Sequence, residues 1–413
     1  MVALSECLLR AQIGHTVTII ASFDVGESTV LIGDAAISSD IEKPELDRNV
    51  PTRGPLRPYM SATGGVDSLG QKLVLISDTC AVAWAGDADS SRVFLGDMRS
   101  MHERGELDDA RVREYALAKT REFRQLAFLV CTINHAGRVL TVRHNTRAPV
   151  STPVGNMHWA GAESGMKAIR RCLARAVHPA RKLSADITSR GSLPRMIRNS
   201  DGAAAGLLVG GALIWKETID GSSLLDRYGG AYEVICSENG VFSKVDNVAF
   251  VFTTVDVSNP DIRTMDLRSD AARNLIRNNR AWWSRYNGSR LRVSTLDWGT
   301  AVDAGSPRPV AARASHEFGE YLDPHVFTDT APDEFDEGLC AAPWLCWHIA
   351  LVRNKRVLDV VPAVVAHELR VRTQRNSHMR IFREPGLLNF SIAPQLIEGV
   401  ILDACRYAGF PRS

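Results

Sequence analysis

A threonine near the start of the chain has the sequence setting of a catalytic nucleophile. Residues 13–20 read IGHTVTII, so a short leader ends in Gly-His and Thr16 then opens an apolar run. Threonine is a preferred strand residue, and Thr16 is therefore either an ordinary strand position or a nucleophile that acts once the peptide bond before it is cut. Thr18 is a second position for the same role, although Thr16 fits the strand pattern better.

Two histidine-bearing segments are weaker candidates for chemistry. The segment VVAHELRV around His367 has the His-Glu start of the zinc-binding HExxH motif, but residue 371 is Val where the second His belongs. The segment SHEFGEYLDPH supplies His316, Glu317 and His325 in an acidic, loop-like context. Neither pattern has the ligand spacing of a metal site, so the sequence predicts no metal and no cofactor.

Residues 273–292 interleave arginines with Trp282, Trp283 and Tyr286. Such a pattern can bind single-stranded nucleic acid, with cations on phosphates and bases stacked on rings. It also suits an amphipathic helix whose tryptophan face docks on the preceding domain. The formal net charge of the whole chain is only +2, which favours the docked helix and predicts no nucleic-acid partner.

The composition is that of a soluble globular protein: 413 residues, 45% hydrophobic and 23% charged. Its 8 cysteines form no Cys-x-x-Cys pair, which predicts free thiols in a reducing cytoplasm. Residues 1–15 have no basic region before their apolar part, unlike a secretory signal peptide. The longest apolar run, 207–215, is shorter than the roughly 20 residues of a membrane span, so we expect a cytoplasmic protein without a membrane partner.

The order of the expected elements favours a layered α+β fold. We expect strands at 17–21, 28–33, 72–77, 80–85, 128–133, 139–144, 157–161, 231–237 and 248–255, and helices beginning near 87, 108, 164 and 202. Strand pairs thus alternate with pairs of helices. The regular strand–helix alternation of a parallel sheet is absent, and this argues for antiparallel hairpins in a sandwich.

Two regions fall outside this order. Residues 42–70 are rich in Pro, Gly and charge, and we expect an irregular excursion or lid. After about residue 258 the composition changes, which predicts a basic helix-like stretch and a Pro/Asp-rich linker over 258–340. Residues 341–413 then predict a small C-terminal α+β module. The main domain spans 16–257 and follows a leader, 1–15, that is a candidate propeptide.

Five segments of the main domain resemble the proteasome β-subunit-like family of N-terminal nucleophile (Ntn) hydrolases. In chain order they read TVTIIASF, VLIGDAAIS, QKLVLISDTCAVAWAGDADSSRVFL, MHWAGAESGMKAIRRCL and GGAYEVICSENGVFSKVD. The resemblance covers roughly residues 15–255 and says nothing about the tail. It implies a four-layer αββα Ntn-hydrolase sandwich with an additional C-terminal α+β extension.

The resemblance also implies roles for three residues. Thr16 matches the nucleophile, and its own freed α-amine would serve as the base, since an α-amine titrates near neutral pH. Lys72 matches a buried lysine whose ammonium favours the alkoxide. Asp34 matches the carboxylate that orients Lys72. Taken singly, Asp34 has the alternative of a turn or cap residue, the commoner role of Asp after a strand, and Lys72 that of a surface lysine at a strand start.

Three further positions match supporting roles in the family. Ser164 falls near its supporting serine, Asp226 near its late aspartate, and the backbone N–H of Gly86 near its oxyanion donor. Ser164 is also a plausible helix N-cap. Two departures stand out: His15 precedes Thr16 where processed members have Gly, and no serine follows Asp226 by three positions.

The resemblance therefore implies a threonine-type peptidase or amidohydrolase. It would cleave peptide or other amide bonds with Thr16 as nucleophile after leader removal. It implies a peptide or protein substrate and a homo-oligomeric ring, and it identifies no unfoldase partner. The alternative is a non-catalytic proteasome-like subunit that acts in assembly or as an interaction scaffold, because some members keep the fold and lose the chemistry.

Overall fold

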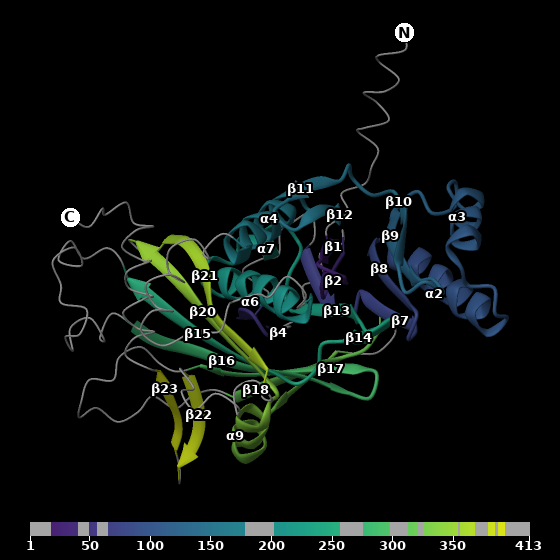
Figure 1. The fold of residues 1–413 in the computed structure, drawn as a ribbon. Helices are drawn as coiled ribbons and strands as arrows, with labels where there is room; N and C mark the ends of the chain where they lie inside the picture. The colour runs from purple at the N-terminus through teal and green to yellow at the C-terminus, as the bar shows by residue number, and fades with distance from the viewer. Residues whose placement is uncertain are drawn as a thin grey trace, which may run out of the picture.

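The computed structural model describes residues 18–39, 49–55, 65–177, 202–256, 276–297, 313–320, 325–353, 356–367, 379–384 and 387–392. Mostly antiparallel strands form three larger sheets, with helices beside and between them (Figure 1). The helices are α2 (Ala88–Glu103), α3 (Asp109–Ala118), α4 (Glu163–Val177), α6 (Gly202–Asp220), α7 (Ser222–Leu225) and α9 (Pro332–Ala341).

Two of the sheets lie face to face. The six-stranded sheet has the order β11 (Val150–Thr152), β12 (Gly155–Gly161), β1 (Ile19–Val25), β2 (Ser28–Asp34), β13 (Tyr232–Glu238), β14 (Val241–Lys244). The four-stranded sheet has the order β10 (Val139–His144), β9 (Leu126–Ile133), β8 (Cys80–Gly86), β7 (Leu73–Ser77). Ile20 and Leu31 pack in the core between the two sheets, whereas Ala21 and Ile32 face the opposite side, as alternation along a strand requires.

Helices cover both outer faces of this sheet pair. On one side α2 and α3 pack on the four-stranded sheet, where Phe94 stacks on Phe128 with ring centroids 4.2 Å apart. On the other side α4 and α6 pack on the six-stranded sheet. Figure 1 shows α2 and α3 at one edge of the molecule and α6 near its middle.

The third sheet has seven strands and packs on the far side of α6. Its order is β19 (Val326–Asp329), β18 (Arg313–Phe318), β17 (Arg290–Asp297), β16 (Ile276–Asn287), β15 (Val248–Asp256), β20 (Trp344–Arg353), β21 (Arg356–His367). The remaining strands form three two-stranded sheets: β3 (Ala36–Ser39) with β6 (Gly65–Leu69), β4 (Asn49–Val50) with β5 (Gly54–Pro55), and β22 (Met379–Glu384) with β23 (Leu387–Ile392).

Residues 202–215 of helix α6 are apolar around the whole circumference, and sheets pack on the helix from two sides. A Cβ at Gly206 would lie 2.4 Å from Val234 of the six-stranded sheet. A Cβ at Gly211 would lie 2.1 Å from the His348 ring of the third sheet. The glycines thus permit close approach on both sides, and a helix that is hydrophobic all round is explained by burial.

The predicted four-layer αββα sandwich with an added extension is wrong. In such a sandwich the helices form the outer layers, but here α6 is an inner layer between two sheets. The chain that was expected to form a separate tail supplies strands to the third sheet. Two of these strands pair with β15: β16 on one edge, antiparallel, and β20 on the other edge, parallel. The result is a mostly antiparallel β protein with several sheets.

The helix-like stretch predicted around Trp282 and Trp283 is also wrong, since both residues lie in strand β16. Consecutive strand residues point to opposite faces, and accordingly Trp282 joins the core near α6 whereas Trp283 packs against Gly338 of α9. The neighbouring arginines bind protein groups. Arg280 donates to the Thr52 carbonyl at 2.8 Å, and Arg292 pairs with Glu334 at 2.9 Å.

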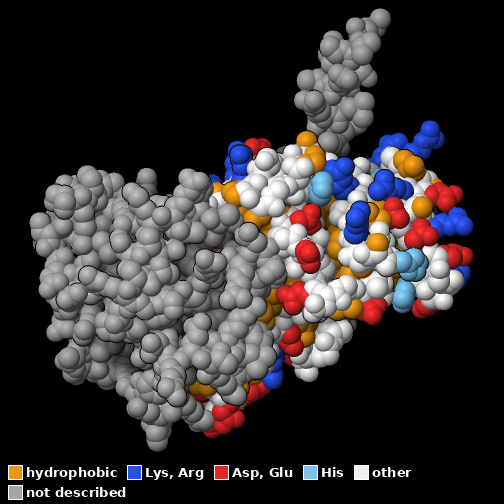
Figure 2. Space-filling view, in the orientation of Figure 1, with side chains coloured by type: hydrophobic (Ala, Val, Ile, Leu, Met, Phe, Trp, Pro, Cys, Tyr) orange, Lys and Arg blue, Asp and Glu red, His pale blue; other side chains and the backbone are white. Residues whose placement is uncertain are grey.

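The described surface mixes charges of both signs. Figure 2 shows acidic and basic side chains interspersed over the face that carries α2 and α3. Among the helices of the described ranges, none has the length and apolar character needed to cross a membrane.

Candidate active site

The ends of three strands bring Thr18, Asp34 and Lys72 together. Thr18 directly precedes β1, Asp34 ends β2, and Lys72 directly precedes β7. All three side chains are buried. Antiparallel pairing of β1 with β2 sets Ile20 opposite Gly33, which brings the residue before β1 next to the end of β2. Two predicted site residues, Asp34 and Lys72, are therefore in contact.

The Lys72 ammonium has an acceptor for each of its three hydrogens. It donates to the hydroxyl Oγ1 of Thr18 at 2.5 Å, to Oδ1 of Asp34 at 3.1 Å, and to the carbonyl oxygen of Ala36. A neutral amine has only two hydrogens, so this geometry suits the charged form. The arrangement holds a fixed positive charge against the threonine hydroxyl.

Asp34 is held by donors from three directions. Its Oδ1 accepts from Lys72 and from the backbone N–H of Ile19 at 3.0 Å, and its Oδ2 accepts from the N–H of Gly229 at 2.8 Å. Gly229 has a φ of 116°, in the region that favours glycine. The carboxylate is thus fixed in one orientation toward Lys72.

Burial perturbs both members of the ion pair. Desolvation raises the pKa of Asp34, and the Lys72 charge together with the Gly229 and Ile19 N–H groups opposes that rise. Desolvation lowers the pKa of Lys72, and the negative charges of Asp34 and Glu233 oppose that fall. A buried lysine with a lowered pKa beside a hydroxyl is a recurring feature of catalytic sites.

The backbone of Thr18 is fixed by the turn that follows β12. The carbonyl of Thr18 accepts from the N–H of Ala162 at 2.7 Å. Gly161 has a φ of 104°, and a Cβ at this position would lie 1.7 Å from the Thr18 carbonyl oxygen. Only glycine allows this approach, so Gly161 determines where Thr18 sits.

Ser164 and Asp226 also meet, at the exposed side of this turn. Ser164 lies in the first turn of α4, and its hydroxyl donates to Oδ2 of Asp226 at 2.5 Å. A side-chain hydrogen bond joins Tyr228 to Ser164, and burial raises the pKa of Tyr228. Gly165 packs between Tyr228 and Ile19, which connects this group to the start of β1.

Gly86 lies at the end of β8, with a φ of 103°. Trp84, two residues earlier, donates its N–H to the Lys72 carbonyl at 3.1 Å, so this part of β8 runs beside Lys72. The role of Gly86 as the oxyanion donor stays a prediction.

The predicted nucleophile Thr16 lies outside the described residues. Thr18, the alternative position, is the threonine that contacts Lys72. Residues 16 and 18 are two apart, so in an extended strand they share a face and the alternation of the sequence cannot separate them. The signal that distinguishes them is three-dimensional: the residue after Thr18 donates its backbone N–H to Asp34.

Two buried carboxyl groups near the site were missed by the sequence interpretation. Glu217 of α6 accepts from Thr52, Ser223 and the N–H of Gly230. Glu233 of β13 accepts from the N–H of Lys72 at 3.1 Å. A charged residue within an apolar helix or strand was the available signal, because such residues are rarely buried without partners.

The two histidine segments are placed as follows in the described ranges. His316 and His325 stack, with 3.1 Å between Nδ1 and Nε2, and burial lowers the pKa of His316 to about 3. His367 ends strand β21 and so does not lie on a metal-binding helix. Within the ranges that the structure describes, no three His, Cys, Asp or Glu side chains cluster as a metal site would require.

Comparison of the chain with models of known protein families and with curated proteins gave no match in either case. The functional argument therefore rests on the geometry of Thr18, Lys72 and Asp34.

Proposed function

We propose that this protein hydrolyses peptide or other amide bonds, with Thr18 as the nucleophile. The observation that carries the proposal is the 2.5 Å contact between the Thr18 hydroxyl and a buried ammonium that Asp34 fixes in place. A hydroxyl is a weak nucleophile at its free pKa, and an adjacent cation favours the alkoxide that attacks a carbonyl.

The base would be the α-amine of Thr18 itself. In the chain as given this nitrogen is tied up in the peptide bond with Val17. Cleavage of that bond frees an amine whose ordinary pKa of about 7.7 to 8.0 leaves much of it neutral near pH 7.5. This is the chemistry of the Ntn hydrolases that the sequence resembles, with the nucleophile two residues later than first predicted.

The reaction would pass through an ester. Thr18 Oγ1 attacks the substrate carbonyl carbon while its proton passes to the α-amine, and the negative charge develops on the carbonyl oxygen. Collapse breaks the C–N bond and transfers the proton to the leaving amine. Water, deprotonated by the same α-amine, then hydrolyses the ester and regenerates Thr18.

The other residues of the site would serve the α-amine and the oxyanion. Ser164, Asp226 and Tyr228 lie at the turn that fixes Thr18, where they can orient a newly freed amine. The N–H of Gly86 would bind the developing oxyanion. The buried cysteines Cys80, Cys131 and Cys346 are free thiols, as in proteins of reducing compartments, and we infer that this activity belongs to the cytoplasm.

The test uses the chain as its own first substrate. Intact mass and N-terminal sequencing of purified protein are expected to show a chain that begins at Thr18. Thr18→Ala should remain uncut at this bond and lose turnover of a fluorogenic peptide-amide panel by at least about 1,000-fold. Lys72→Ala should abolish both cleavage and turnover.

Thr16→Ala is the matched control, since it removes the same side chain two residues earlier. It should be cleaved before Thr18 and keep its turnover. Cleavage before residue 16 with loss of activity in Thr16→Ala would return the nucleophile to Thr16. An uncut N-terminus together with no turnover would support the non-catalytic scaffold instead.

A further inference from the structure

We propose that the third sheet acts as a positioning clamp on Lys72, through Gln71 and the buried carboxylate of Glu233. The proposal rests on the proposed function, because positioning of Lys72 matters to catalysis only if Lys72 serves Thr18. Under this proposal, strands that follow residue 276 support catalysis by positioning Lys72.

The carboxylate of Glu233 is fully buried and joins the site to the third sheet. Its Oε2 accepts from the N–H of Lys72 at 3.1 Å and from the N–H of Leu73 at 3.5 Å. Its Oε1 accepts from the hydroxyl of Tyr286 at 2.9 Å and from Lys244 at 3.5 Å. Burial of a carboxylate is costly unless its oxygens are paired, and here both oxygens are.

Tyr286 supplies the contact from the third sheet. It lies near the end of β16, just before the turn into β17, and its own N–H donates to Asp246 at 2.6 Å. Burial and the nearby Glu233 raise the pKa of Tyr286, so its hydroxyl stays protonated and remains a donor. Lys244 lies 4.5 Å from the centroid of the Tyr286 ring and hydrogen-bonds to Gln71.

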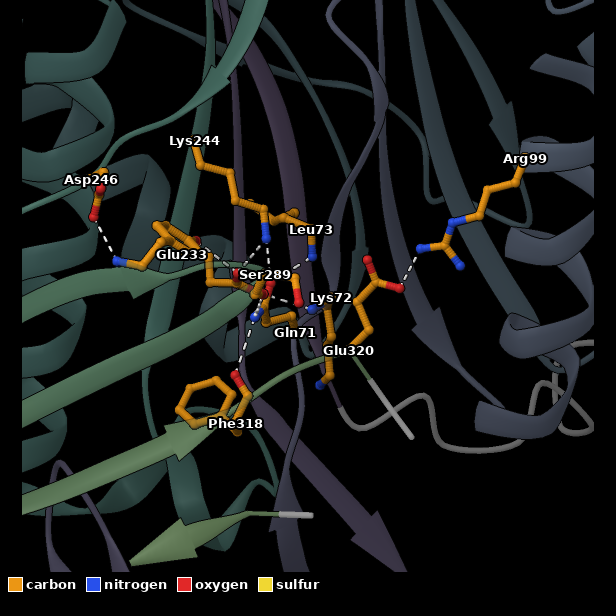
Figure 3. A network of polar contacts seen from close by, with 11 residues as sticks. Gln71, Lys72, Leu73, Arg99, Glu233, Lys244, Asp246, Ser289, Phe318 and Glu320 are labelled. Atoms are coloured by element: carbon orange, nitrogen blue, oxygen red, sulfur yellow. Dashed lines mark hydrogen bonds and ion pairs between the residues drawn. The ribbon is translucent and has the colours of Figure 1, made fainter. Parts of the chain in front are cut away.

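Gln71 extends the clamp to the backbone of the third sheet. Its Nε2 donates to the carbonyls of Ser289 at 2.6 Å and Phe318 at 3.1 Å, and its N–H donates to the Gly319 carbonyl at 2.9 Å. Ser289 lies in the β16–β17 turn and Phe318 ends β18. Figure 3 shows Gln71 close to Ser289 and Phe318, with Lys72 and Glu233 nearby.

A second contact ties the same region to α2. Glu320 forms a parallel bridge with Gln71 and an ion pair with Arg99 of α2. The residue that precedes Lys72 is thus held by the third sheet and, through Glu320, by the helix layer on the far side. A shift of the β16–β17 turn would therefore move the backbone that carries the Lys72 side chain, and displacements of about 1 Å are enough to slow catalysis.

Tyr286→Phe in the full chain tests the clamp with the smallest change. It removes the hydroxyl that donates to Glu233 and keeps the ring. We expect the amides of Lys72 and Leu73 to exchange with deuterium about 10-fold faster, measured by mass spectrometry, because a bond to a charged acceptor is lost. We also expect kcat to fall about 10-fold while KM stays within about 2-fold.

Tyr115→Phe is the matched control. Tyr115 of α3 likewise donates to a carboxylate, Asp97 of α2, at 2.6 Å, but it lies in the outer helix layer. It should leave the exchange of the Lys72 and Leu73 amides and kcat at the wild-type values. Equal effects of Tyr115→Phe and Tyr286→Phe on kcat would overturn the clamp.

Amide exchange at Lys72 and Leu73 tests the clamp independently of hydrolase activity. The comparison is repeated in Thr18→Ala, where Tyr286→Phe should still accelerate exchange at Lys72 and Leu73. Unchanged exchange overturns the clamp, even if the wild type is an active hydrolase. Faster exchange with unchanged kcat overturns its catalytic purpose, whereas a wild type without turnover contradicts the proposed function itself.

Discussion

At the scale of single residues, two buried carboxyl groups share one turn. Asp34 accepts the N–H of Gly229, and Glu217 accepts the N–H of Gly230 at 2.7 Å. A Cβ at Gly229 would lie 1.7 Å from Glu217, so glycine is required here as well. A displacement of the Glu217 carboxyl group would therefore shift this turn, and with it Asp34 and its partner Lys72.

Glu217 gives the fold a pH dependence that can be measured. Burial raises its pKa from 4.5 to about 7, so the folded state holds this proton more tightly than the unfolded state. The stabilisation is greatest below pH 4.5 and is lost as the pH rises toward 7. From pH 5 to pH 7.5 the free energy of unfolding should fall by about 2 kcal/mol through this group.

Glu217→Gln should abolish this contribution. The amide keeps an oxygen for the Gly230 N–H, and its NH₂ can donate to Ser223 or Tyr232. The free energy of unfolding is measured in urea for the wild type and for Glu217→Gln at both pH values. The difference between the two proteins excludes the contribution of other titrating groups. Equal pH dependence in the two proteins would show that Glu217 does not titrate in this range.

Some residues of the site could be predicted from the sequence and others could not, for a physical reason. Asp34 and Lys72 stand at strand ends within segments that resemble the family, and this resemblance marks them; taken singly, each has an ordinary structural interpretation. Thr18 shares a strand face with Thr16, so only the contact with Lys72 selects it. The partners of Glu217 and Glu233 come from distant parts of the chain, and no local pattern reports them.

At the scale of elements, the turn between β12 and α4 determines where the nucleophile lies. The strand ends at Gly161, and the next residue donates to the Thr18 carbonyl. Such a turn lets one strand position the start of another without a side chain. Its dependence on a single glycine makes it easy to test.

Gly161→Ala should lower turnover by more than its loss of folding stability explains. The new Cβ would meet the Thr18 carbonyl oxygen at 1.7 Å, so Thr18 must move, and turnover should fall about 100-fold or more. A positive φ of 104° adds about 1 to 3 kcal/mol of strain. Turnover and thermal unfolding are measured on the same preparation.

Gly155→Ala is the control that introduces the backbone strain of a positive φ without the clash with Thr18. Gly155 begins the same strand with a φ of 120°, but a Cβ there would meet nothing within 4 Å. It should lose only the stability that the strained φ costs, and keep its turnover. Equal loss of turnover in both variants would mean that strain in β12, and not displacement of Thr18, is responsible.

Elements with local patterns were predicted better than those with distant partners. The helices expected from 164 and 202 are confirmed as α4 and α6, and the hairpins of β1 with β2 and β7 with β8 are present. The segment around Trp282 failed because its apolar residues fit a helical face as well as a strand. Pairing with strand β15 selects the strand over the helix, and this pairing is a tertiary interaction that the local sequence does not report.

At the scale of the whole molecule, β15 and α6 join the first part of the chain to the last. Strand β15 has neighbours on both edges, β16 and β20, and both come later in the sequence. Helix α6 is linked to the same sheet by hydrogen bonds from Trp215 to the Thr253 carbonyl at 3.1 Å and from His348 to the Leu208 carbonyl at 3.0 Å. The third sheet is thus a structural neighbour of the site and of its core.

A chain truncated after residue 256 should fail to fold in soluble form. Removal of β16 and β20 would leave both edges of β15 unpaired and the apolar face of α6 toward the third sheet uncovered. Expression of residues 1–256 should give aggregated protein, whereas the full chain should give one cooperative unfolding transition by calorimetry. A soluble 1–256 chain with native-like circular dichroism would mean that the first part folds alone. Cleavage before Thr18 in that truncated chain would further show that Lys72 reaches its position without the third sheet.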